Sequence, residues 1–212
     1  MSTIQEKEKV VEEQQPRNQI NINPIKRLFE SPTRSLKPYV KNGQTAIDLA
    51  CHTGYYTLAL AECVGSEGKV YAVDLDEKAI QTVQKEVDGS GYHNIELHTA
   101  SAADLNFIKD ESVDFVLANG LLCSMSDQRL SAVKEIKRII KPDGQAYLSL
   151  GGPPPLGYVN RTEWEEILEG FKVKQRGQVL FGFQKWAIVS KKDQQMSGGN
   201  EESTGRHKIL HP

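Results

Sequence analysis

The chain has 212 residues, of which 38% are hydrophobic and 25% are charged, a balance typical of a globular protein with one domain. Its formal net charge of −2 argues against a protein held on nucleic acid or an anionic membrane mainly by electrostatics, since such proteins carry a basic excess. The three cysteines (Cys51, Cys63 and Cys123) show no C-x-x-C spacing, so we expect neither a disulfide framework nor a metal site.

The two ends of the chain differ in composition from its middle. Residues 1–22 are rich in Glu, Gln and Lys, and residues 193–212 are polar and contain several Gly and Ser. Such segments bury too little apolar surface to offset their chain entropy, so we expect two disordered tails around one domain at 23–192. No apolar run approaches ~18 residues and the first residues lack a signal pattern, which predicts a cytoplasmic protein without membrane insertion.

The first half of the predicted domain alternates helices and strands. A short helix is expected at 24–29, and a second one has Ser31 as its cap and Pro32 as its first position. Asn42 and Gly43 predict a turn. The elements expected after this turn are a strand at 45–50, a helix at 54–64, a strand at 69–75 and a helix at 76–88.

The second half continues this alternation. Strands are expected at 94–99 and 113–118, and a helix at 127–141 places Leu130, Val133, Ile136 and Ile140 on one stripe before Pro142. Asp143 and Gly144 predict a turn into a strand at 145–150, and Thr162 is the expected cap of a helix at 162–170. Two final strands are expected around 171–180 and 183–191.

Short connections between alternating strands and helices indicate a doubly wound parallel sheet with helices on both faces. The last two strands are separated only by a few residues around Gly182, which allows a hairpin but no crossover helix. The final strand is therefore predicted to run antiparallel to the others.

The stretch "TAIDLACHTGYY" at 45–56 is predicted to lie where such sheets bind ligands, at the carboxyl end of the first strand. Asp74 follows Gly54 by 20 residues, about the spacing of an acid that accepts hydrogen bonds from both hydroxyls of a ribose. A dinucleotide pyrophosphate needs three glycines in this turn, and the turn has only one; it is also no P-loop. This disfavours a nicotinamide-dependent enzyme and favours a nucleoside without phosphates.

From about Leu36 to Lys192 the chain resembles the class I S-adenosyl-L-methionine (SAM)-dependent methyltransferases, in particular small ones akin to those of quinone biosynthesis. The resemblance rests on five motifs in order. They are "AIDLACHTG", "KVYAVDLDEKAI", "ASAADLNF", "SVDFVLANGLL" and "EIKRIIKPDGQAYLSL". It implies a Rossmann-like sheet of seven strands in the order 3-2-1-4-5-7-6, with the last strand antiparallel.

The resemblance also implies how SAM is bound. Asp74 would hold the ribose, Leu75 the adenine, and Asp48 the turn amides and the amino group of SAM, although Asp48 could instead be a strand-end acid in a salt bridge. Ser101 replaces the family's usual Asp at the adenine amine, while Ala50 and His52 replace two glycines. The expected cofactor-binding residues are Asp48, Ala50, His52, Gly54, Tyr55, Asp74, Leu75, Ser101, Ala102 and Asn119.

The catalytic residues stay open, with His52 and Tyr158 as the candidates for a general base, should one be needed. We expect the backbone at His52 to suit a non-glycine residue, so that glycine there would not improve cofactor binding. Segments 25–39, 119–126 and 151–160 are predicted to enclose a small-molecule acceptor, and no nucleic-acid partner is expected. The alternatives are a methyltransferase acting on protein or RNA and a non-catalytic SAM-binding protein; the oligomeric state and the acceptor are not predicted.

Overall fold

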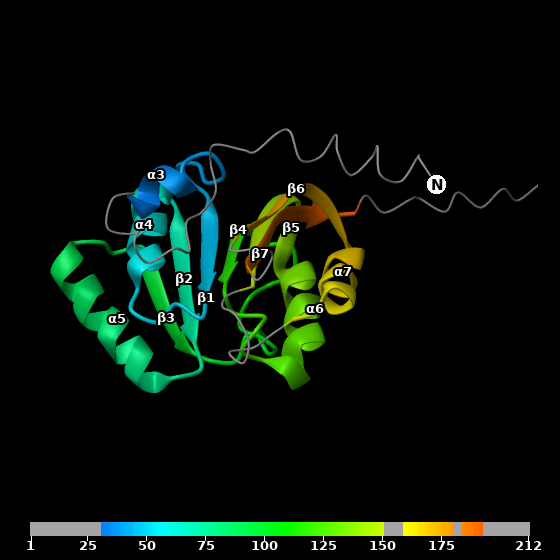
Figure 1. Cartoon of the computed structure of the whole chain (residues 1–212). Helices are drawn as coiled ribbons and strands as arrows, with labels where there is room; N and C mark the ends of the chain where they lie inside the picture. The colour runs from blue at the N-terminus through cyan, green and yellow to red at the C-terminus, as the bar shows by residue number, and fades with distance from the viewer. Residues whose placement is uncertain (1–30, 151–158, 180–183, 193–212) are drawn as a thin grey trace, which may run out of the picture.

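The computed structural model describes residues 31–150, 159–179 and 184–192, in which a seven-stranded sheet lies between two layers of helices (Figure 1). The elements up to the middle of the sheet are α3 (Pro32–Leu36), β1 (Thr45–Leu49), α4 (Tyr55–Val64), β2 (Lys69–Asp74), α5 (Glu77–Ser90), β3 (Ile95–Thr99) and β4 (Val113–Asn119). They are followed by a 3-10 turn (Ser126–Gln128), α6 (Arg129–Ile139), β5 (Ile140–Ser149), α7 (Arg161–Glu169), β6 (Phe171–Val179) and β7 (Gln184–Lys191).

The strands are arranged in the order β3-β2-β1-β4-β5-β7-β6. Strands β1 to β5 pair in parallel, and β7 runs antiparallel to both β5 and β6. The predicted fold class, including the strand order and the antiparallel last strand, is therefore confirmed. The predicted tails (1–22 and 193–212) and the helix at 24–29 lie outside the described residues, and the domain limits of 23–192 stay a prediction.

Two large buried apolar clusters, one on each face of the sheet, form most of the core, and a third, small one contains Val83 of α5. Helices α6 and α7 cover one face through residues such as Val133, Ile136 and Trp164. On the opposite face, α3 and α4 pack against Phe115, Tyr147 and other residues of the central strands. Because both faces are covered, the central strands read as nearly continuous apolar sequence rather than as an alternating pattern.

The prediction for α6 was wrong in its buried stripe and in its end. Leu130 is 54% exposed, whereas Arg129 is buried, because the Arg129 Nε donates a hydrogen bond to the carbonyl of Leu122 at 2.7 Å. The helix ends at Ile139, and Ile140 already belongs to β5. The predicted turn at 143–144 is instead an irregularity within β5, where Gly144 lies so close to the Val113 carbonyl that a Cβ would approach it to 3.0 Å.

The cap of the last helix was also assigned to the wrong residue. Asn160, not Thr162, precedes α7, and its side chain accepts a hydrogen bond from the Glu163 amide at 3.0 Å. The Glu163 carboxylate in turn accepts from the Asn160 amide at 2.8 Å, which completes a capping box. This reciprocal pair outweighs the weaker capping preference of threonine.

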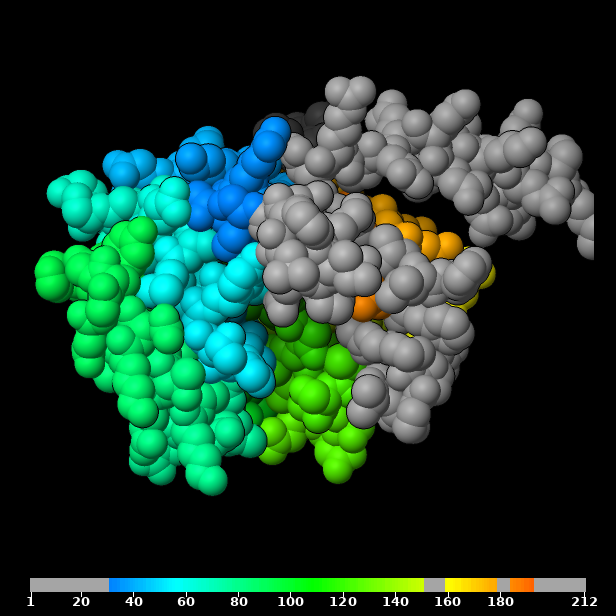
Figure 2. Space-filling view, turned by 60° about the vertical axis from the view of Figure 1, so that its left-hand side comes forward, coloured from blue at the N-terminus to red at the C-terminus, as the bar shows by residue number. Residues whose placement is uncertain are grey.

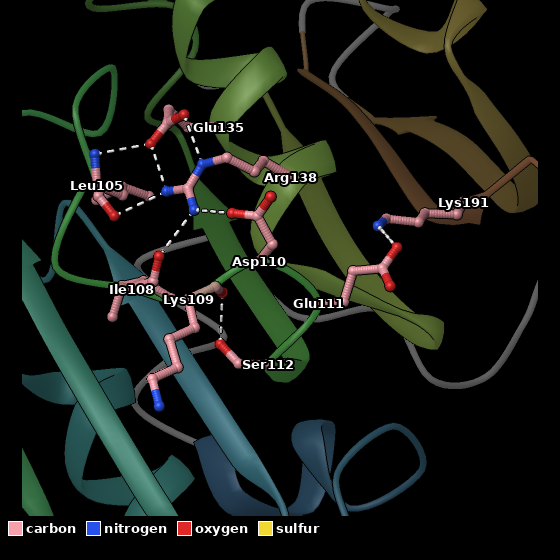
Figure 3. A network of polar contacts seen from close by, with 9 residues as sticks. All are labelled: Leu105, Ile108, Lys109, Asp110, Glu111, Ser112, Glu135, Arg138 and Lys191. Atoms are coloured by element: carbon pink, nitrogen blue, oxygen red, sulfur yellow. Dashed lines mark hydrogen bonds and ion pairs between the residues drawn. The ribbon is translucent and has the colours of Figure 1, made fainter.

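A polar network joins α6 to the loop that follows β3 (Figure 3). The Arg138 guanidinium donates to the carbonyls of Leu105 and Ile108, each at 2.8 Å, and forms ion pairs with Glu135 and Asp110. Glu135 also accepts from the Leu105 amide at 2.8 Å, and Arg138 holds the pKa of its carboxyl below the usual value. The backbone of this loop is therefore fixed by side chains of one helix.

We expect Arg138→Met to lower the free energy of unfolding by about 2 kcal/mol, because it leaves two part-buried carbonyls without their donor. Urea denaturation followed by circular dichroism measures the loss. Lys191→Met is the matched control: the 2.6 Å pair between Lys191 and the half-exposed Glu111 is worth at most about 1 kcal/mol. Equal losses in the two variants would contradict this role of Arg138.

Candidate functional site

The turn between β1 and α4 has three residues in the left-handed conformation that glycine favours, but only one of them is a glycine. Ala50, His52 and Gly54 all have left-handed backbones, with φ of +61°, +49° and +77°. The expectation that the backbone at His52 suits a non-glycine residue is therefore wrong. Side chains are disfavoured in this region, so the turn holds two strained residues, Ala50 and His52, separated by a single residue, as is common at ligand sites.

We expect His52→Gly to raise the free energy of unfolding by about 1 kcal/mol, because glycine relieves the left-handed strain at this exposed position. His93→Gly is the matched control, since His93 is an exposed histidine outside the residues with positive φ. There glycine only adds entropy to the unfolded chain and should be destabilising. Thermal melts of both variants test the contrast; stabilisation by neither would remove the strain argument.

Asp74 ends β2 and is bonded to the turn. Its Oδ2 accepts a hydrogen bond from the His52 amide at 3.0 Å, and its Oδ1 accepts from the Asp76 amide at 2.9 Å. Helix α5 is capped by Asp76, whose side chain accepts from the Lys78 amide, so capping is not the task of Asp74. A carboxylate has about four lone-pair positions, which leaves two for a ligand. Leu75 beside it is 73% exposed, unusual for a large apolar side chain.

Asp48, near the end of β1, is buried under the same turn with 3% of its surface exposed. It has a partner in Thr57, whose hydroxyl donates to Oδ2 at 2.7 Å, and no cationic partner among the salt bridges of the described residues. Burial raises the pKa of Asp48 to about 7, and the nearby charge of Asp74 acts in the same direction. A carboxyl of this kind, set against a second acid, is typical of a functional site.

Ser101 and Ala102 lie next to Asp74 because β2 and β3 are parallel neighbours and the amide of Ala100 donates to the Asp74 carbonyl at 2.9 Å. The Ser101 hydroxyl donates to Gln128 Oε1 at 3.1 Å and accepts from the Ala103 amide. Ala102 is buried. The loop that carries these residues is the one that Arg138 holds.

Asn119 ends β4 and is oriented by a neighbouring strand. The Ser149 hydroxyl donates to Asn119 Oδ1 at 2.8 Å and accepts from the Gly120 amide at 3.0 Å. This contact uses one of the two lone pairs of the Asn119 amide oxygen and fixes the orientation of the side chain, which also carries an N–H donor group. The third polar end of a strand at this edge is therefore also positioned by hydrogen bonds.

The structure brings most of the predicted site together at one edge of the sheet, because β1, β2 and β4 are parallel and their carboxyl ends meet there. In Figure 2 the cyan surface around α4 borders the green surface of the middle of the chain. Tyr55 starts α4 at this edge, and its ring packs edge-on against Tyr56 at 5.1 Å. Tyr158 and most of the segment 151–160 lie outside the described residues, as do residues 25–30.

Two residues of this region were not predicted. Thr57 holds Asp48 from the first turn of α4, and Gln184 begins β7 at the same edge of the sheet. Helical spacing could have suggested Thr57, three residues after Gly54. Within the three described stretches, no group of three or more His, Cys, Asp or Glu side chains could hold a metal ion, and no helix is long and apolar enough to cross a membrane.

The family model described as "Methyltransferase domain" matches residues 46–144, which contain the turn, Asp48, Asp74 and Asn119. A demethylmenaquinone methyltransferase of Geobacillus stearothermophilus is 38% identical over 105 residues, covering 50% of this chain and 44% of the relative. The Bacillus velezensis enzyme of the same name is 36% identical over 120 residues, covering 56% and 51%. The chain thus spans about half the length of these relatives.

Among solved structures, a SAM-dependent methyltransferase from Aquifex aeolicus superposes with a TM-score of 0.62 at 25% identity. The match covers 80% of this chain and 98% of the other. The family model, the sequence relatives and this structure agree with the resemblance that the five motifs suggest, and the resemblance is confirmed.

Proposed function

We propose that this chain is a class I SAM-dependent methyltransferase similar to those of quinone biosynthesis, and that it transfers a methyl group from SAM to a small-molecule acceptor by in-line displacement. The observation that carries the proposal is the bond between Asp74 and the turn. It joins a left-handed turn at the end of β1 to the acid at the end of β2, and an exposed Leu75 follows that acid. These features suit a nucleoside without phosphates. Asp74 can accept hydrogen bonds from a ribose, Leu75 can contact an adenine, and the turn can hold a small charged group.

The chain's residues would divide the binding of SAM between them. Asp74 offers its remaining lone pairs to the ribose hydroxyls, and Leu75 and Ala102 offer apolar contact to the adenine with Ser101 at its edge. The turn at Ala50, His52 and Gly54, with Asp48 beneath it and Tyr55 and Asn119 beside it, would hold the methionine part. Asp48, once ionised, would supply negative charge beneath the turn, where the cationic methionine part of SAM would lie.

In this reaction the protein mainly has to orient the two reactants, and it contributes little to the chemical activation of the methyl group. SAM supplies an activated methyl group on its sulfonium, so the protein mainly has to hold the nucleophile in line with the methyl and the sulfur. Such positioning is worth ~7–11 kcal/mol of barrier. A general base is needed only for a nucleophile that carries a proton at neutral pH, and His52 and Tyr158 are the candidates for it.

The acceptor is a small molecule in this proposal, and a reduced quinone ring is the first class to test. Two relatives, each matched by this chain over about half of the relative's length, are called demethylmenaquinone methyltransferases, and this supports the choice. A net charge of −2 gives no support to a nucleic-acid substrate. The domain that performs the reaction is proposed to span residues 23–192.

Calorimetry with SAM, S-adenosylhomocysteine and NAD tests the cofactor. We expect both adenosyl ligands to bind and NAD not to bind. Incubation with methyl-labelled SAM and 1,4-naphthoquinone, reduced with dithionite, tests the transfer, in which a ring C–H bond is replaced by C–CH3 and one proton is released. Absence of adenosyl-ligand binding at millimolar concentration would overturn the proposal, whereas binding without label transfer would exclude this acceptor.

A further inference from the structure

The first residue of β7, Gln184, lies at the edge of the sheet that carries the cofactor residues. Strand β7 is antiparallel to β5, so its beginning lies next to the end of β5. Ser149 pairs with Trp186, and the Leu150 amide donates to the Lys185 carbonyl at 2.8 Å. Asn119, Ser149 and Trp186 are level with one another, and Gln184 therefore lies two residues further out at this edge.

The side chain of Gln184 belongs to the face covered by α3 and α4. Side chains alternate along a strand, so Gln184 shares a face with Trp186, which is buried and stacks on Tyr147 at 6.2 Å between ring centroids. Tyr39, Tyr55 and Tyr56 belong to the same cluster. Gln184 is thus a polar residue at the edge of a sheet face that is rich in aromatic side chains.

The side-chain oxygen of Gln184 is buried and unpaired. The residue is 8% exposed, and Oε1 is the one buried side-chain nitrogen or oxygen without a hydrogen-bond partner in the described stretches. A buried oxygen without a hydrogen-bond partner destabilises the folded chain, because it has lost its bonds to water and gained none in return. The Ser149 hydroxyl at the same edge donates its hydrogen to Asn119 and accepts from the Gly120 amide, so it has no hydrogen left to donate to Gln184.

We propose that Gln184 is an acceptor-binding residue, whose side-chain oxygen accepts a hydrogen bond from an O–H or N–H group on a flat aromatic acceptor. This rests on the proposed function. With the adenosine over β2 and β3 and the methionine part over the turn, the methyl group is open to a nucleophile on the side of β4, β5 and β7, where Gln184 lies. A bound hydroxyl would supply the partner that the free protein lacks and would fix the rotation of the ring against the methyl group.

The test uses two probes of similar shape, 1,4-dihydroxynaphthalene kept reduced with dithionite and 1,4-dimethoxynaphthalene, which has no donor. Both are titrated calorimetrically into the full chain, with and without S-adenosylhomocysteine. The wild type should prefer the dihydroxy probe about tenfold. Gln184→Leu should lose this preference, bind S-adenosylhomocysteine within twofold of the wild type, and melt at a higher temperature because the unpaired oxygen is gone.

Gln145→Leu, the same change in the middle of β5 and away from the edge that carries the cofactor residues, is the control and should keep the preference of the wild type. Equal binding of the two probes by the wild type would overturn the assignment of Gln184, and so would a preference that survives in Gln184→Leu. Failure of S-adenosylhomocysteine to bind counts against the proposed function instead, and the titrations without it then decide on Gln184.

Discussion

Asp74→Ala is expected to weaken the binding of S-adenosylhomocysteine about 100-fold. The change removes a charged acceptor that has two lone-pair positions left for the ribose hydroxyls, and each hydrogen bond to a charged group is worth ~1.5–3 kcal/mol. It also releases the amides of His52 and Asp76, which Asp74 now holds at 3.0 and 2.9 Å. Isothermal titration calorimetry of the purified chain measures the loss.

Asp76→Ala is the matched control, because it removes a carboxylate two residues away that caps α5. It should cost about 1 kcal/mol of stability and leave the affinity within about threefold. Asp74→Asn should lie between the two, since the amide keeps one acceptor oxygen but loses the charge. If Asp76→Ala weakens binding as much as Asp74→Ala, the loss reflects the local backbone and not a ribose contact.

The order of strands and helices could be predicted from the sequence, because the patterns that indicate each element are local and recur along the chain. Each strand is a short apolar run, each helix has a cap or a stripe, and the narrow gap around Gly182 permits only a hairpin between the last strands. The errors arose where a tertiary contact changed a local preference. Arg129 displaced Leu130 from the buried stripe of α6 through its bond to the Leu122 carbonyl, and Asn160 displaced Thr162 as a cap through its pairing with Glu163.

The candidate site also has some features that the sequence predicts and others that only the tertiary structure shows. The spacing between Gly54 and Asp74 is visible in sequence because parallel strands bring their ends to one edge whatever the details of packing. The strain at Ala50 and His52 was not visible, since residue identity gives no φ, and a turn with non-glycine residues suggests a relaxed backbone. Gln184 was missed because its position depends on the register between β5 and β7, which sets it beside the end of β5.

Asp48 gives the second large effect, a dependence of stability on pH. Burial raises the pKa of its carboxyl from 3.8 to about 7, so the folded chain binds this proton more tightly than the unfolded chain does. The stability that it contributes is complete below about pH 4 and is lost as the pH rises through about 7. Between pH 5 and pH 8 the wild type should therefore lose about 3 kcal/mol relative to Asp48→Asn.

Urea denaturation at the two pH values measures this difference, and the comparison with Asp48→Asn cancels the other titrations. The asparagine keeps an oxygen that can accept from the Thr57 hydroxyl, so the packing under the turn is retained. Asp88→Asn, which changes an exposed carboxyl of α5, should follow the wild type. A constant difference between wild type and Asp48→Asn across this range would mean that Asp48 is ionised throughout.

The same carboxyl should couple binding of the cofactor to release of a proton. Without a ligand, Asp48 and Asp74 repel each other, and Asp48 is partly protonated at neutral pH. SAM brings a sulfonium and an ammonium group, whose positive charges favour the ionised form and lower the pKa of Asp48. With a pKa near 7 in the free protein, about 0.9 proton should leave at pH 6 and about 0.1 at pH 8.

Calorimetric titrations of SAM in two buffers with different ionisation enthalpies count the released protons, and the affinity should rise with pH until Asp48 is ionised in the free protein. Asp48→Asn should remove this carboxyl's share of the release and should bind SAM at least tenfold more weakly above pH 7, where the wild type presents a negative charge and the variant does not. Any release that remains in Asp48→Asn belongs to the other titrating groups, including the amino group of SAM. Equal release by the wild type and Asp48→Asn at pH 6 would show that the cofactor's charges do not act on Asp48, and the carboxyl would then serve only to hold Thr57 and the turn.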